Sequence, residues 1–340
     1  MSDIRYQTHL GKYVVGDSVE ILPGKMGKKL ANKIQLILTS PPFPLNNKKR
    51  YGNKQGLDYR EWFTHLAEVF APLLTDTGSI VIELGNAWEP GRPVQSLLPL
   101  ESLLGFVNNE KAGLRLCQQF ICYNPSRLPT PAQWVTVNRM RAIDSYTNIW
   151  WMSKNDFPKA DNRRVLRPYS ASMKSLLKKR SYNSGRRPSE HQIGSESFLK
   201  DNGGSIARNL LELEAIDPSR EPRLPNIFSI ANTSSNDFFS RTCRERNIPL
   251  HPARMPLELA CFYVEFLTEA GDLVFDPFAG SNTTGFAAEL LHRKWMAIEI
   301  DESYAKQSAV RFEDPSIDTS IKYPEADNGN DRNDSKASTG

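Results

Sequence analysis

Apolar runs of strand length alternate with segments of helical spacing through most of this chain. Four of the runs are long enough for a fully buried strand, and each ends at a turn or a carboxylate: residues 34–38, 78–85, 273–276 and 295–299. Residues 58–74 repeat apolar side chains at the spacing of an amphipathic helix. Apolar strands that alternate with helices are typical of a parallel sheet covered on both faces. The pattern therefore predicts an α/β fold built on a mostly parallel, doubly wound sheet.

The first of these strands ends in an unusual turn, in which Thr39 is followed by Ser40, Pro41, Pro42 and Phe43. Consecutive prolines fix φ and remove two backbone donors, so the turn presents carbonyl oxygens that no helix or sheet pairs with. A hydroxyl, a free carbonyl and an aromatic ring suit a planar base with an exocyclic amino group, because the oxygens accept from the amino group and the ring stacks on the base. The alternative is a purely structural turn, since short motifs also match by chance.

A second unit of strand, turn and helix lies far downstream. The run at 273–276 leads into Asp276-Pro-Phe-Ala-Gly280-Ser-Asn-Thr-Thr-Gly285, and the strand after the next helix ends in Glu299. Small residues let the backbone approach a ligand at the start of a helix, and an acid about 20 residues further on can bind ribose hydroxyls. The Gly-x-Gly-x-x-Gly pattern of dinucleotide sites is missing. These features favour an adenosine with an amino-acid tail, which points to S-adenosylmethionine.

The two units together indicate a methyltransferase. Ligands of open α/β sheets bind at the carboxyl ends of the strands, near the point where the strand order reverses, and both units occupy such ends. An amino group held at the first unit could attack a methyl donor held at the second, without a cysteine nucleophile. A nicotinamide dehydrogenase is the competing interpretation, and the missing glycine pattern disfavours it.

Basic side chains are concentrated in the middle of the chain. The net charge of +4 is modest, yet residues 159–187 hold ten basic side chains against one acid, Asp161. So one-sided a run predicts a polyanion partner rather than a solvated face alone. The basic segment at 46–53, next to the first turn, could also contact phosphate or close over substrate.

Other features narrow the class of protein. No apolar run is long enough to cross a bilayer, and the first residues lack an apolar signal region, so we expect a cytoplasmic protein with no membrane partner. We expect reduced thiols and no metal site, because the spacing of the four cysteines is not that of metal ligands: Cys117, Cys122, Cys243 and Cys261.

In this order, Thr-Ser-Pro-Pro-Phe and Asp-Pro-Phe-Ala-Gly-Ser-Asn-Thr-Thr-Gly resemble the motifs of DNA amino-methyltransferases of the β arrangement, whose catalytic motif precedes the cofactor motif. The chain is most similar to the PvuII-type cytosine-N4 methyltransferases of type II restriction-modification systems, from about residue 13 to 312. The resemblance implies a Rossmann-like, S-adenosylmethionine-dependent fold in four parts. These are a catalytic half at 1–154, a target-recognition module at 155–250, a cofactor-binding half at 251–313 and a flexible tail at 314–340.

The resemblance also implies roles for individual residues. The target base would lie at Ser40, Pro41, Pro42 and Phe43, and Glu83 stands where relatives often have an aspartate that could accept the amino proton. The cofactor would lie along a second set, with Glu299 at its ribose and Asp17 at its adenine: Asp276, Phe278, Gly280, Ser281, Asn282 and Thr283. The stretch at 251–256 would lie near its methionine end. DNA would be held by a third, basic set: Lys48, Lys49, Arg50, Arg163, Arg164, Arg167, Lys174, Lys178, Arg186 and Arg187.

The implied activity is methylation of cytosine N4 in double-stranded DNA after the base is flipped out of the stack. It would protect DNA from a cognate restriction endonuclease, and the enzyme would act as a monomer or weak dimer. Serine at position 40 is the cytosine-N4 pattern, whereas adenine-N6 enzymes usually have Asp or Asn there. Tyr123 stands in place of a more usual tryptophan. Adenine-N6 methylation on the same scaffold and a DNA-binding relative without catalysis are the alternatives.

Overall fold

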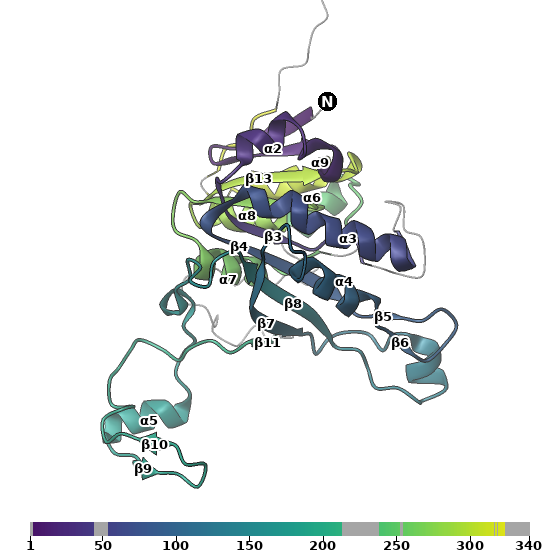
Figure 1. The fold of residues 1–340 in the computed structure, drawn as a ribbon. Helices are drawn as coiled ribbons and strands as arrows, with labels where there is room; N and C mark the ends of the chain where they lie inside the picture. The colour runs from purple at the N-terminus through teal and green to yellow at the C-terminus, as the bar shows by residue number, and fades with distance from the viewer. Residues whose placement is uncertain are drawn as a thin grey trace, which may run out of the picture.

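The computed structural model describes residues 3–43, 54–212, 238–251, 254–315, 317 and 319–323. These residues form one sheet of nine strands, covered by helices (Figure 1). From one edge to the other the strands are β1 (Asp3–Gln7), β2 (Gly11–Val15), β13 (Lys294–Glu299), β12 (Leu273–Asp276), β3 (Ile34–Thr39), β4 (Leu74–Gly85), β8 (Tyr146–Ser153), β7 (Arg115–Tyr123) and β11 (Leu210–Glu212). All but β1 and β8 run in the same direction, which confirms the predicted mostly parallel sheet.

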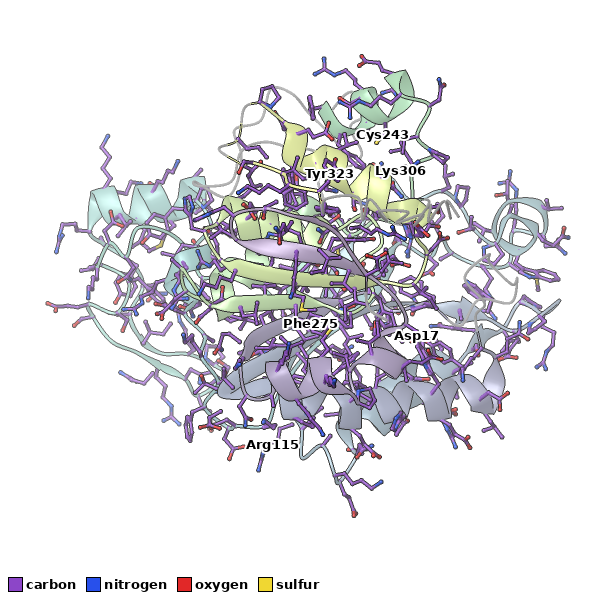
Figure 2. All side chains as sticks on the ribbon, turned by 90° about the horizontal axis from the view of Figure 1, so that it is seen from above. Asp17, Arg115, Cys243, Phe275, Lys306 and Tyr323 are labelled. Carbon is purple, nitrogen blue, oxygen red and sulfur yellow. The ribbon has the colours of Figure 1, made fainter. Side chains whose placement is uncertain are left out.

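Helices cover both faces of the sheet. One face packs against α3 (Gly56–Phe70) and α4 (Leu98–Val107), and the other packs against α7 (Leu257–Leu267), α8 (Thr283–Leu290) and α9 (Ser303–Val310). Phe275 of β12 is fully buried between the layers (Figure 2). The remaining helices and turns are α1 (Ser18–Ile21), α2 (Lys25–Leu30), α5 (Ala171–Lys179), α6 (Phe238–Glu245), η1 (Ala71–Leu73), η2 (Gln133–Val137), η3 (Asn162–Val165) and η4 (Arg311–Glu313).

Helix α3 shows how the apolar spacing works. Tyr59, Phe63, Leu66 and Phe70 recur every three or four residues, and all four are fully buried against the sheet and α4. The sequence predicts this helix as far as residue 74, but it ends at Phe70. Pro72 lacks the backbone N–H that would continue the helical hydrogen bonds, so the chain continues as a short 3₁₀ turn.

The strand order places a switch point in the middle of the sheet. β3 and β12 are neighbours, and the chain leaves β3 toward α3 on one face but leaves β12 toward α8 on the other. Ligand sites of open α/β folds lie at such a point, beyond the carboxyl ends of the strands. The architecture therefore directs attention to the residues that follow Thr39 and Asp276.

A small lobe projects away from the sheet. This outer lobe, residues 168–204, holds α5 and the paired strands β9 (Gly185–Arg186) and β10 (Gln192–Ile193), and it lies apart from the body in Figure 1. Arg167 and Ser205 close its neck through two backbone hydrogen bonds of 2.8 and 2.7 Å.

The proposed division of the chain into four parts stays a prediction. Residues assigned to the target-recognition module contribute the outer lobe, β11 of the main sheet and α6, which packs on α9. In the assigned tail, Lys322 bridges to Gln7 of β1, and residues 324–340 lie outside the described part of the chain. Among the helices that the structure describes, none is long and apolar enough to cross a membrane. All four cysteines are free thiols.

Candidate active site

The site begins where β3 and β12 end side by side. The Thr39 hydroxyl donates to Oδ1 of Asp276 at 2.7 Å, which joins two strand ends that are 237 residues apart in sequence. The backbone N–H of Phe278 donates to the same oxygen at 3.1 Å. Burial raises the pKa of the Asp276 carboxyl to about 6, against the opposing effect of these hydrogen bonds. Asp276 thus ties the turn after β12 to the end of β3.

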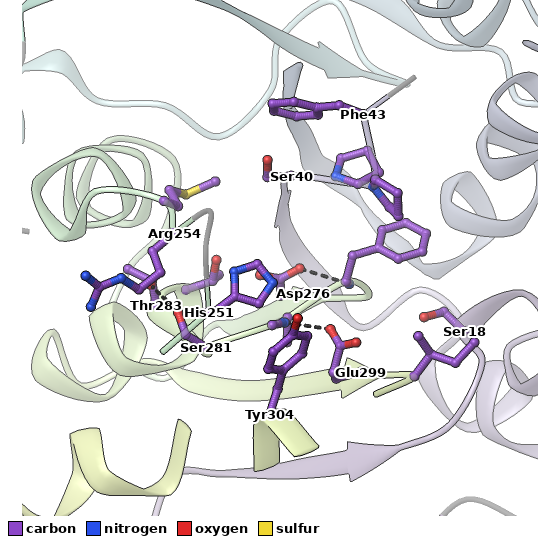
Figure 3. Close-up of a pocket in the computed structure, with 18 of the residues that line it drawn as sticks. Ser18, Ser40, Phe43, His251, Arg254, Asp276, Ser281, Thr283, Glu299 and Tyr304 are labelled. Carbon is purple, nitrogen blue, oxygen red and sulfur yellow. Dashed lines mark hydrogen bonds between the residues drawn. The ribbon is translucent and has the colours of Figure 1, made fainter. Parts of the chain in front are cut away.

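One cavity of about 240 Å³ adjoins this junction and is lined from both halves of the chain (Figure 3). The structure brings together in its lining most of the residues that the sequence predicts for the base and the cofactor: Asp17, Ser40, Pro41, Pro42, Phe43, Asp276, Phe278, Gly280, Ser281, Thr283 and Glu299. The two units that the sequence places far apart therefore face the same space.

The turn after β3 is held from two sides. Tyr59 of α3 donates its hydroxyl to the Pro42 carbonyl at 2.8 Å. Phe43 lies against Gly85, the last residue of β4, so closely that a Cβ on Gly85 would stand 2.7 Å from the ring carbon Cε2. Among the described residues, none forms a hydrogen bond with the Ser40 hydroxyl or the Pro41 carbonyl. The turn is therefore fixed, while two of its oxygens stay available to a ligand.

A single carboxylate shapes the loop after β12. Glu299, at the end of β13, accepts hydrogen bonds from the backbone N–H of Gly280 at 2.7 Å and of Asp301 at 2.9 Å. Gly280 has φ of 47°, a conformation that glycine adopts without steric cost. Tyr13 donates its hydroxyl to the Gly280 carbonyl at 2.9 Å. Burial outweighs the two backbone hydrogen bonds and raises the pKa of Glu299 to about 7.

Asp17 and Asn282, two further predicted cofactor residues, also have partners within the protein. Asp17 lines the cavity and also caps α1, because its Oδ1 accepts from the backbone N–H of Val19 at 2.8 Å. Asn282 is fully buried and is not part of the cavity lining. Its amide donates to the Tyr6 hydroxyl at 2.9 Å, and its Oδ1 accepts from Gly285 N–H at 3.1 Å, which caps α8.

Glu83 lies on β4, outside the cavity lining. Its Oε1 accepts from the Thr147 hydroxyl of β8 at 3.0 Å. Burial raises the pKa of Glu83, and the Thr147 hydrogen bond and the Arg127 charge oppose that effect. The structure therefore pairs this carboxylate with the neighbouring strand β8.

The predicted DNA-binding residues fall into three groups. Lys48, Lys49 and Arg50 lie outside the described residues. Arg163 pairs with Asp161 at 2.8 Å, and Arg164 donates to the Thr268 carbonyl at 2.5 Å and pairs with Glu269 at 3.1 Å. Arg167 lies at the neck of the outer lobe, and the lobe itself carries Lys174, Lys178, Arg186 and Arg187. Arg163 and Arg164 are thus already engaged by the protein.

Several lining residues were not singled out from the sequence. Tyr59 and Trp62 come from α3, where their spacing looks like ordinary helix core. Arg254 lies in the stretch predicted near the methionine end and stacks over Phe239 at 5.4 Å. Of these three residues, only Arg254 carried a signal, namely its place after His-Pro-Ala.

Comparison with known proteins agrees with this geometry. Residues 34–310 match the family model described as DNA methylase. The chain is 39% identical over 92% of its length to the type II methyltransferase M.PvuII of Proteus hauseri, of which it covers 86%. It is 23% identical to the type II methyltransferase M.BglII of Bacillus subtilis, over 87% of this chain and 67% of that protein.

A solved structure described as the PvuII DNA methyltransferase (cytosine-N4-specific) superposes on the chain with a TM-score of 0.68 and 33% identity. The match covers 92% of this chain and 89% of the other. Such likeness in sequence and fold over nearly the whole length, together with the family match, leads to one conclusion: the chain belongs to the DNA methylase family.

Proposed function

We propose that this DNA methylase transfers a methyl group from S-adenosylmethionine to N4 of a cytosine in double-stranded DNA. The observation that carries the proposal is the single cavity in which the Ser40 turn faces the loop of Gly280 and Glu299. The similarity to M.PvuII, and to a structure whose name specifies cytosine N4, favours this amino group over that of adenine.

The loop side of the cavity fits the donor. Gly280 leaves room between this loop and His251, since a Cβ on residue 280 would stand 3.2 Å from the ring nitrogen Nε2 of His251. Glu299 would hold the ribose hydroxyls, and Asp17 and Phe278 would flank the adenine. Arg254 is a cation in the lining with no carboxylate partner among the described residues, so it suits the carboxylate of the methionine tail. When bound, S-adenosylmethionine supplies an electrophilic methyl group on its sulfonium sulfur.

The turn side of the cavity fits the base. Ser40 and the Pro41 carbonyl accept hydrogen bonds from the exocyclic amino group, which keeps its lone pair directed toward the donor side. Phe43 covers one face of the ring. Tyr59 holds the neighbouring Pro42 carbonyl and thereby fixes the direction of the turn. These residues act by positioning. We place Glu83 behind this site, as a buried support of β4 and β8.

The amino group of a paired cytosine is inaccessible inside the duplex, so the base must rotate out of the stack. In this proposal residues 155–250 recognise the target, and the basic side chains of the outer lobe hold phosphates. The protein acts as a monomer or weak dimer and protects DNA from a cognate restriction endonuclease in the cytoplasm.

Methyl transfer from labelled S-adenosylmethionine to purified duplex DNA tests the proposal. Digestion to nucleosides must yield N4-methylcytosine, and Ser40→Ala must slow transfer while donor binding stays intact. N6-methyladenine as the only product would overturn the base assignment. Failure to bind the donor at all would favour a DNA-binding relative without catalysis. Single-base sequencing of the methylated DNA would then identify the recognition site.

A further inference from the structure

A second surface of the protein shares the edge of the sheet that holds the cavity. It consists of residues 86–97 and 124–145, which we call the pocket-edge lobe. The first segment leaves the end of β4 and forms the hairpin of β5 (Ala87–Trp88) and β6 (Gln95–Ser96), and the second joins β7 to β8. Gly85 pairs with Thr147 and Tyr123 pairs with Tyr146, so both segments emerge at the carboxyl edge.

The two segments of the pocket-edge lobe contact each other through side chains. Asn86 donates its side-chain amide to Asp144 at 2.8 Å. Arg141 donates to the Pro93 carbonyl and lies over the Trp88 ring at 5.5 Å. These contacts cross between the segments, so the surface is in place before any ligand arrives.

The outer lobe, by contrast, starts from the opposite edge. The chain leaves β8 at Ser153, which pairs with Ser79 on β4 and with Arg115 on β7, at the end away from the cavity. In Figure 1 the outer lobe and the β5–β6 hairpin accordingly lie on opposite sides of the lower half of the molecule. The cluster of basic residues that the sequence makes conspicuous is therefore not the surface next to the base site.

The exposed charge of the pocket-edge lobe is positive. Arg127 and Asp144 lie 3.8 Å apart and offset each other. Arg92, Arg139 and Arg141 are exposed, and Glu89 is the one further acid of the lobe. The lobe thus presents an excess of cations beside a cavity that would receive a base attached to a phosphate backbone on both sides.

Arg139 is the exposed cation of this lobe that the protein itself leaves without a partner among the described residues: none of them forms a hydrogen bond or ion pair with it. Its backbone φ is 52°, a conformation that residues other than glycine and asparagine rarely adopt. The neighbouring amides of Gln133 and Asn138 are joined at 2.6 Å.

We propose that the pocket-edge lobe is a DNA-binding surface of this enzyme, in which Arg139 contacts the duplex next to the flipped cytosine. This proposal rests on the proposed function and extends it, because it moves part of DNA binding from the outer lobe to the edge of the cavity. The partner is double-stranded DNA, recognised first through its phosphates.

The test compares Arg139→Gly, Arg139→Ala and the matched control Lys29→Ala by fluorescence anisotropy with a labelled DNA duplex. Glycine keeps the positive φ without strain, so Arg139→Gly removes the charge and leaves the backbone as it is. Lys29 lies on α2, just before β3 begins at the opposite edge, and its replacement removes one exposed cation there.

Both Arg139 variants should bind duplex about tenfold more weakly than the wild type, and the slope of log affinity against log salt should fall by about one. Donor affinity should not change, and Lys29→Ala should bind like the wild type. Wild-type affinity and salt slope in Arg139→Gly would overturn the proposal, as would an equal loss in Lys29→Ala. The readout is DNA affinity, so absence of methyl transfer by the wild type would count against the proposed function alone.

Discussion

Replacing Gly85 with alanine should disturb the base site without touching the donor site. The added Cβ would stand 2.7 Å from Cε2 and 3.0 Å from Cδ2 of the Phe43 ring, where ordinary contact begins near 3.4 Å. Gly85 is buried on an inner strand of the sheet and pairs with Thr147 of β8, so the strand has little room to retreat. Phe43 borders the cavity and is only partly buried. The ring should therefore move, by about 0.7 Å or more.

The size of that movement sets the expected loss. Misplacing a reacting group by about 1 Å can cost roughly 100-fold in rate, so we expect single-turnover methyl transfer to slow by between about 10-fold and 100-fold. Overpacking of this kind lowers the free energy of unfolding by about 1–3 kcal/mol. Affinity for the donor should be unchanged, because the loop of Gly280 and Glu299 does not contact Gly85.

Two comparisons make the result specific. Gly105 of α4 is a matched control, since a Cβ there would crowd Thr64 of α3, and neither residue lines the cavity. Gly105→Ala should lower stability and leave the rate intact. In the background of Gly85→Ala, Phe43→Leu should cost much less than it does alone, because the clash has already displaced the ring. An unchanged rate in Gly85→Ala, or additive losses in the double variant, would refute the reasoning.

Three further predictions follow from the same contacts. Tyr59→Phe removes the hydrogen bond to the Pro42 carbonyl. It should lower the free energy of unfolding by about 1 kcal/mol and slow single-turnover methyl transfer at saturating donor. An unaltered rate would show that the turn keeps its position without this hydrogen bond. Arg254→Ala should raise the dissociation constant of the donor about tenfold in calorimetric titration, with no change in DNA affinity, and equal donor affinity would exclude the carboxylate contact. Burial raises the pKa of Glu299 from 4.5 to about 7. The carboxyl proton is therefore held more tightly in the folded, donor-free protein than in the unfolded chain. The free energy of unfolding should accordingly fall as pH rises from about 4.5 to about 7. If Glu299 holds the ribose as proposed, donor binding needs the ionised carboxylate and should strengthen over about pH 6 to 8. Glu299→Gln should flatten both profiles in denaturation and titration experiments.

The sequence alone was sufficient to predict the parts of this site that depend on short, contiguous sequence patterns. Apolar strands identified the sheet, and the rule that ligands lie at carboxyl ends of strands correctly brought the Ser40 turn and the Gly280 loop to one cavity. The roles of Tyr59 and Gly85 could not be found in this way. Each depends on how a helix or a strand lies across a turn elsewhere in the chain, and in sequence they look like a core aromatic residue and a strand-terminal glycine.

Asn282 and the basic cluster show which details of the site a sequence pattern does not specify. A polar residue in a cofactor loop reads as a ligand contact, but the amide of Asn282 turns inward to Tyr6 and caps α8. Charge density along the chain drew attention to residues 159–187, yet charge density carries no information on which edge of the sheet a segment leaves. That information is in the strand register, which only the structure provides.

The pairing of β3 with β12 also bears on how the protein is made. During synthesis β3 emerges long before its neighbour, since Thr39 and its partner Asp276 are separated by 237 residues. Until the second strand arrives, a mostly apolar strand that is fully buried in the folded protein has a bare hydrogen-bonding edge, which is a template for pairing with other chains. A nascent chain that stalls before residue 273 should therefore be prone to aggregate, and ribosome-bound fragments of increasing length should become protease-resistant in one late step.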